Sequence, residues 1–278
     1  MTDPGLLSNL SLIAIAAILL IGVPHGGMDG AIARRAGWPA GMLSWILFHL
    51  VYLLLAVSVA FVWWLYPLPS LIFFLAISAL HFGSSDIRHI SAPSSRDTWL
   101  PLLAHGGLVV IAIPGFQGSA VEPLFAVLVG KENSLWLLQQ IDSLLLPWAV
   151  LLFAYGIYSL FQPRWRWTLF NLALLTALAY LLPPLVSFAL YFCLWHSRRH
   201  MQQTWRAIAP EQRRRSAIET LVYSLLAFVA AGLFFVVQTQ NGSASGITPT
   251  LLQLTFVGLA ALTVPHMLLV DFTNGQRE

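Results

Sequence analysis

Long apolar runs, separated by short stretches of proline, glycine and charged residues, dominate the chain. Most runs reach the roughly 20 residues that an α-helix needs to cross the hydrocarbon core of a bilayer. Pro183-Pro184 separates two of them by almost nothing and predicts a tight antiparallel hairpin. Residues 117–135 form the longest ambiguous connection, with room for a short interfacial helix at 120–129. The pattern predicts transmembrane helices at 5–25, 41–65, 69–88, 99–116, 136–160, 166–182, 184–206, 216–238 and 250–270.

The composition agrees with this pattern. Hydrophobic residues make up 58% of the 278 residues and charged residues only 9%, whereas soluble proteins carry about a quarter charged residues. Too little polar sequence remains to cover a soluble core of this size. We therefore predict an all-α integral membrane protein, a polytopic bundle of about nine transmembrane helices, or eight if one short segment is re-entrant. No internal repeat or linker stands out, so we expect a single domain over residues 1–278.

The basic residues predict an orientation. If the N-terminus is outside, every arginine lies at or beyond the inner end of a predicted helix, and only Lys131 lies outside. Cytoplasmic loops are expected to carry such an excess of lysine and arginine. We therefore expect nine helices in the inner (plasma) membrane of the cell, with the C-terminus cytoplasmic. The net charge of +3 is explained by this topology, and we expect no nucleic-acid partner.

Five histidines lie at similar depth in this topology. His25 closes the first helix, His81 lies in the third, His196 and His200 lie toward the inner end of the seventh, and His266 lies near the inner end of the ninth. Polar side chains inside the membrane are expensive and mark function by default. A lone buried histidine is better explained by a bond to a carbonyl or hydroxyl group. Five at one level predict a shared transition-metal site, because imidazole is the commonest ligand for such metals.

The neighbours of these histidines support the same hypothesis. His196 and His200 are four residues apart and project from one helical face. Metal-bound imidazoles usually donate their other N–H group to a carboxylate or carbonyl, which makes Asp29 and Asp86 candidates for this outer role. The alternative places both carboxylates at helix ends, facing headgroups and arginines. Three further histidines lack such a context and are left out of the ligand set: His49, His89 and His105.

The ligand types narrow the choice of metal. Cys193 is the single cysteine, which excludes a thiolate-rich site. The Glu-x-x-His pairs of di-iron bundles and the His-Glu-x-x-His helix of zinc proteases are absent from the sequence. Neutral imidazoles without a directly bound carboxylate suit an Fe(II) centre with open positions for dioxygen. Haem ligation by paired histidines is the competing use.

Four short motifs occur in order along the whole chain: Pro24-His25-Gly26, His81-Phe82-Gly83, His196-Ser197-Arg198-Arg199-His200 and Pro265-His266. Together they resemble the Brp/Blh family of integral-membrane β-carotene 15,15′-dioxygenases. The resemblance implies that His25, His81, His196 and His200 bind iron. It leaves His266 in the second shell or the pocket, together with Asp29 and Asp86. One departure is the pair Gly27-Met28, where family members often have Ala and Leu; small and apolar character is kept.

The resemblance also implies an activity for the chain as one transmembrane dioxygenase domain. The expected reaction is Fe(2+)-dependent cleavage of the central 15,15′ double bond of β-carotene by dioxygen, giving two molecules of all-trans-retinal. No catalytic residue beyond the metal site is expected, and a microbial rhodopsin is a candidate recipient of the retinal. Phe82, Tyr191 and Trp195 are candidates for contact with the substrate. Two alternatives stay open: a non-catalytic carotenoid-binding, retinal-binding or opsin-assembly protein, and a membrane haem protein using the same histidines.

Overall fold

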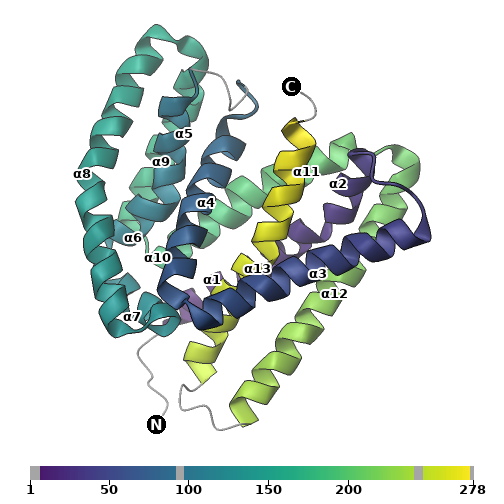
Figure 1. The fold of residues 1–278 in the computed structure, drawn as a ribbon. Coiled ribbons are helices and arrows are strands. Elements are labelled where there is room, and N and C mark those ends of the chain that lie inside the picture. The colour runs from purple at the N-terminus through teal and green to yellow at the C-terminus, as the bar shows by residue number, and fades with distance from the viewer. Residues whose placement is uncertain (1–6, 92–96, 241–246, 276–278) are drawn as a thin grey trace. The chain divides into compact units, whose positions relative to one another are not determined.

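In a computed structural model of the protein, every regular element of the described residues is a helix (Figure 1). The structure describes residues 7–91, 97–240 and 247–275, with the backbone alone for 271–275. The prediction of an all-α protein is therefore confirmed. The first two residues of the predicted helix 5–25 lie outside this range, as do Arg96 and Arg277 of the charge argument.

Seven helical segments within the described ranges are long and apolar enough to cross a membrane. This confirms the class of polytopic, all-helical membrane protein. The seven segments are α1 (Asn9–Gly27) with α2 (Asp29–Arg35), α3 (Met42–Leu65), α4 (Pro67–Ile87), α5 (Trp99–Gly107) with η1 (Leu108–Ala112) and α6 (Ile113–Phe116), α8 (Lys131–Phe161), α12 (Pro210–Gln240) and the part of α13 (Ile247–Gly275) that ends at Val270.

The other two predicted spans are helical but are built differently. Helix α9 (Arg166–Leu181) has only 16 residues and follows the short turn η2 (Pro163–Trp165). The predicted span 184–206 is divided into α10 (Pro184–Ala189), the π-helix η3 (Leu190–Ser197) and α11 (Arg198–Ala207). The number of nine spans and the orientation of the termini stay predictions. The expected short helix at 120–129 corresponds to α7 (Gly118–Val129).

The chain forms two compact units, and the expectation of one domain over 1–278 stays a prediction. The first unit comprises residues 1–67 and 192–278. Within it, α1 packs against α12 and α13, and α13 crosses α3 (Figure 1). The end of α1 approaches α12 closely, because a Cβ atom at Gly27 would lie only 3.0 Å from the carbonyl oxygen of Thr220. Small residues permit such close helix contacts inside membranes.

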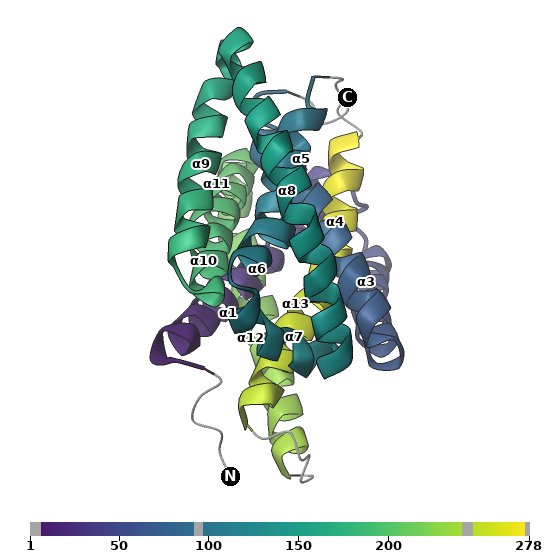
Figure 2. The same ribbon diagram turned by 90° about the vertical axis from the view of Figure 1, so that its left-hand side faces the viewer.

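The second unit comprises residues 68–191, and its helices α5 and α9 pack against the long helix α8 (Figure 2). Two glycines let α4 and α5 touch backbone to backbone. A Cβ atom at Gly83 would overlap the carbonyl oxygen of Leu102, and one at Gly106 would overlap that of Ala79. The glycine of the His81-Phe82-Gly83 motif therefore has a packing role. It fixes the crossing of the two helices.

Candidate metal centre

His25 lies at the end of α1, just before the chain turns into the short helix α2. Pro24 stands inside the last turn of α1, and Gly26 and Gly27 follow His25 before α2 begins at Asp29. The imidazole of His25 is 5% exposed and the carboxylate-bearing Asp29 is 3% exposed. A buried carboxylate requires hydrogen-bond donors. The abrupt end of α1 thus places an acidic and an imidazole side chain within one short, buried segment.

His196 and His200 lie on either side of the change from π-helix to α-helix. His196 belongs to η3 and is buried, whereas His200 belongs to α11 and is half-buried. A π-helix closes its hydrogen bonds over one more residue than an α-helix does, and such segments occur frequently at functional sites. The ring of Phe192, one turn before His196, stacks beside it at a centroid distance of 6.1 Å.

His266 lies in α13 directly after Pro265, and it is 3% exposed. Its ring is close to those of His25 and His200, with centroid distances of 4.7 and 5.2 Å. The sequence placed His266 outside the set of direct ligands. The structure brings it into contact with two of the predicted ligands in the first unit.

Three imidazoles offer nitrogen atoms to one small volume. One ligand nitrogen each from His25, His200 and His266 lies within 4.8 Å of the others. Nε2 of His25 is 3.2 Å from Nε2 of His266. Metal–nitrogen bonds of about 2.0–2.1 Å separate neighbouring ligands by roughly 3 Å, so this spacing suits a shared cation. A hydrogen bond between the imidazoles of His25 and His266 would explain why these two rings are close. It would not explain why the ring of His200 lies beside them.

His196 approaches the same cluster from η3. Its ring centroid is 5.4 Å from that of His25, while the centroid of His200 is 4.5 Å from His25. Four of the five histidines singled out from the sequence therefore lie together in the first unit. The donor set consists of imidazoles, and it fits a borderline transition metal such as Fe(II).

Asp29 orients His266. Its Oδ1 is 2.6 Å from Nδ1 of His266, and its Oδ2 accepts a hydrogen bond of 2.8 Å from the hydroxyl group of Tyr52. A carboxylate oxygen accepts, so Nδ1 of His266 carries the proton and Nε2 presents its lone pair to the cluster. Carboxylate–histidine pairs of this kind fix the tautomer and ring orientation of metal ligands. The sequence predicted that Asp29 accepts a hydrogen bond from a metal-bound imidazole, but it gave no indication that Tyr52 takes part.

Two aromatic side chains of η3 lie near these histidines in the sequence, Phe192 and the predicted substrate contact Trp195. Phe192 contacts the rings of both His25 and His196. Trp195 is half-buried, and the guanidinium group of Arg199 lies 4.3 Å from the centroid of its ring. Its role in substrate binding stays a prediction from the sequence.

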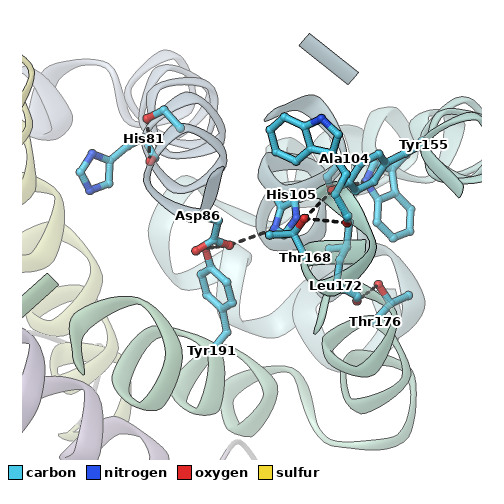
Figure 3. Close-up of polar contacts among 12 residues, drawn as sticks. His81, Asp86, Ala104, His105, Tyr155, Thr168, Leu172, Thr176 and Tyr191 are labelled. Atoms are coloured by element: carbon cyan, nitrogen blue, oxygen red, sulfur yellow. Dashed lines mark hydrogen bonds and ion pairs between the residues drawn. The ribbon is translucent and has the colours of Figure 1, made fainter. Parts of the chain in front are cut away.

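His81, Phe82, Asp86 and Tyr191 belong to the second unit. All four are buried, and the rings of Phe82 and Tyr191 meet edge to face at a centroid distance of 5.4 Å. Asp86 contacts His105 and Tyr191, while His81 points away from this pair of contacts (Figure 3). The assignment of His81 as a metal ligand and the substrate contacts of Phe82 and Tyr191 stay predictions.

The fold and this cluster define a class: a polytopic helical membrane protein with several imidazoles converging in its interior. The family model described as "Beta-carotene 15,15'-dioxygenase" matches residues 16–274. The chain belongs to this family and is a dioxygenase.

Two curated relatives agree with the family assignment. The chain is 35% identical over 272 residues to "Beta-carotene 15,15'-dioxygenase" of an uncultured marine bacterium, covering 93% of this chain and 92% of the relative. It is 26% identical to "Probable beta-carotene 15,15'-dioxygenase Blh" of Halobacterium salinarum, covering 94% and 83% of the two chains. No solved structure matches the chain.

Proposed function

We propose that this dioxygenase cleaves the central 15,15′ double bond of β-carotene with dioxygen and releases two molecules of all-trans-retinal. The names of both relatives support the substrate and the position of cleavage. The observation that carries the proposal is the convergence of the buried His25 and His266 with the half-buried His200. A cluster of imidazoles among apolar helices has the ligands that a dioxygen-dependent metal enzyme requires.

Iron is the proposed cofactor, and the chain supplies its ligands from separate helices. His25, His200 and His266 form the core of the proposed site, and His196 adds a fourth imidazole from η3. His81 is retained as a ligand on the basis of its sequence motif. Bound Fe(II) would supply an open coordination position and redox chemistry toward dioxygen.

The protein's own side chains prepare this site. Asp29 holds the proton on Nδ1 of His266, and Tyr52 holds Asp29, so Nε2 of His266 stays available as a ligand. The ring of Phe192 forms an apolar wall beside His25 and His196. Burial of these groups excludes bulk water, which protects reactive species from side reactions.

A site at membrane depth suits a substrate that is soluble in lipid. β-Carotene is a long apolar polyene, so it can reach such a site from the bilayer without passing through water. We place the enzyme in the inner (plasma) membrane, where the lipid bilayer, dioxygen and β-carotene are its partners and a microbial rhodopsin is a candidate acceptor of the retinal. The apolar helices agree with a membrane location.

Expression in bacteria that accumulate β-carotene tests the proposal. We expect the orange colour to fade and retinal to appear in the extract, while the His200→Ala variant leaves β-carotene intact. The purified protein should contain iron and show no Soret absorption. Persistent β-carotene without retinal would favour a non-catalytic carotenoid-binding protein, and a Soret band would favour a haem protein.

A further inference from the structure

The second unit holds a buried polar cluster of its own, and this cluster joins three helical elements. Asp86 of α4 accepts hydrogen bonds at Oδ2 from Nδ1 of His105 in α5, at 3.2 Å, and from the hydroxyl group of Tyr191 in η3, at 3.1 Å. The three residues are only 1–2% exposed. Figure 3 shows both donors converging on the same carboxylate.

The packing of α4 on α5 brings this cluster together. Gly83 and Gly106 allow the two backbones to touch, one turn from Asp86 and next to His105 respectively. The sequence showed His105 only as a histidine followed by two glycines. In the structure Gly106 brings α5 against α4 at Ala79, whereas Gly107 lies against the ring of Trp148 in α8.

Stability alone does not explain this arrangement. Ionisable groups buried at membrane depth are expensive, and replacing a buried ionic pair by apolar side chains is often neutral or stabilising. Moreover, Nε2 of His105 has no hydrogen-bond partner among the described residues. A buried polar group without a partner requires an explanation. The cluster as a whole therefore calls for a role other than stability, and the positioning of neighbouring residues is such a role.

Two members of the cluster, Asp86 and Tyr191, each share a helix with a predicted iron ligand. Asp86 follows His81 by five residues on α4, and Tyr191 precedes His196 by five residues on η3. Five residues are the interval that a π-helical hydrogen bond spans, so Tyr191 and His196 lie on successive turns of η3. On the α-helix α4, an interval of five residues places His81 and Asp86 on different sides of the helix. His81 accordingly points away from the contacts of Asp86 (Figure 3).

We propose that Asp86 is a positioning residue, which holds Tyr191 near the start of η3 and thereby holds in place the next turn of η3, which carries His196. His105 holds the carboxylate in place from α5. This inference rests on the proposed function, because it assigns the clamp of Asp86, His105 and Tyr191 to the iron site. Asp86 itself does not touch iron or substrate.

The Tyr191→Phe variant tests the clamp, because it removes one hydroxyl group and keeps the ring. The matched control is Tyr155→Phe. Tyr155 is fully buried in the same unit, and its ring meets that of His105 edge to face at a centroid distance of 6.2 Å, a contact that phenylalanine keeps. Its hydroxyl group bonds Thr168 of α9 at 2.8 Å and no member of the clamp. Purified, iron-loaded proteins are mixed with a ferrous chelator, and the rate of iron loss is followed together with the thermal unfolding temperature.

We expect Tyr191→Phe to lose iron about 10-fold faster than the wild type. Removing a residue that supports a metal ligand usually weakens metal binding by about 10- to 100-fold, and 10-fold is the lower end of that range. Tyr155→Phe should lower the unfolding temperature to a similar extent but release iron at the wild-type rate. Asp86→Asn should also accelerate iron loss. The double variant Tyr191→Phe/Asp86→Asn should lose iron no faster than Asp86→Asn alone, because the effects of two residues that act through one contact are not additive.

The outcomes separate the clamp from the proposed function. If wild-type protein binds iron and Tyr191→Phe and Asp86→Asn both release it at the rate of Tyr155→Phe, the positioning role is wrong and the iron site stands. Additive effects in the double variant would likewise contradict action through Asp86. If wild-type protein binds no iron under loading conditions, the proposed function fails and the clamp hypothesis fails with it.

Discussion

Asp29 shows how a single buried carboxylate can set the chemistry of a cluster of imidazoles. It accepts from Nδ1 of His266 and from the hydroxyl group of Tyr52, so it fixes both the tautomer and the direction of one ligand. The carboxylate is 3% exposed, and these donors replace the water that it loses on burial. The proposed metal site therefore depends on a residue that need not touch the metal.

Replacing Asp29 by Asn should weaken iron binding by about 10- to 100-fold, the usual effect of losing an outer partner of a metal ligand. The amide no longer offers two anionic acceptors to His266 and Tyr52. Iron per protein, measured after dialysis against limiting iron, checks this. Asp142→Asn is the control, because Asp142 lies exposed on α8. Equal iron content in both variants would show that Asp29 has no such role.

His266 separates two interpretations of the site. The sequence motifs place it in the second shell or the pocket, whereas the geometry places its Nε2 3.2 Å from Nε2 of His25. We expect His266→Ala to lose iron as His25→Ala does, because it removes a ligand. His49→Ala is the control; its imidazole bonds Trp45 and Tyr223 in the same unit. Full iron content with lost turnover in His266→Ala would favour the pocket role.

At the scale of elements, the ends of several helices could be predicted well. The expected ranges 41–65 and 99–116 compare with α3 at Met42–Leu65 and with the segment Trp99–Phe116. Glycine, proline and charge mark these ends in the sequence. The π-helix η3 could not be predicted, because its winding follows from contacts with other helices and leaves the apolar pattern unchanged.

The α4–α5 crossing gives a prediction at this scale. Gly83→Ala should destabilise the protein by about 1–3 kcal/mol, the usual effect of overpacking, because its Cβ atom would overlap the carbonyl oxygen of Leu102. Gly156→Ala on α8 has open space and should be neutral or stabilising, since alanine favours a helix. Thermal unfolding in detergent measures both. An unchanged unfolding temperature for Gly83→Ala would contradict the close crossing.

At the scale of the whole molecule, hydropathy predicts the class of fold but not how the helices pair. Composition alone indicated a helical membrane protein, and seven segments of the described chain meet the requirements for a span. The convergence of His25, His200 and His266 depends on helix packing across more than 200 residues of sequence, which spacing cannot reveal. His196 and His200 could be paired from sequence because they lie four residues apart in one continuous helical segment, η3 followed by α11.

The topology can be tested with reporters at the C-terminus. With the N-terminus outside, nine spans place the C-terminus in the cytoplasm, as arginine placement predicts, whereas eight place it outside. We expect a C-terminal green fluorescent protein to be fluorescent and a C-terminal alkaline phosphatase to be inactive. The same fusions placed after Lys131, which is predicted to lie outside, provide the internal control. An active phosphatase at the C-terminus would contradict the predicted orientation.

The central claim is that buried histidines hold iron for the dioxygenase reaction, and X-ray absorption at the iron edge tests it most directly. The wild-type spectrum should show several nitrogen neighbours at about 2.1 Å with the multiple scattering of imidazole rings. That imidazole signal should fall in His200→Ala and His266→Ala and persist in His49→Ala. A wild-type spectrum without imidazole scattering, or one unchanged in both cluster variants, would contradict the account.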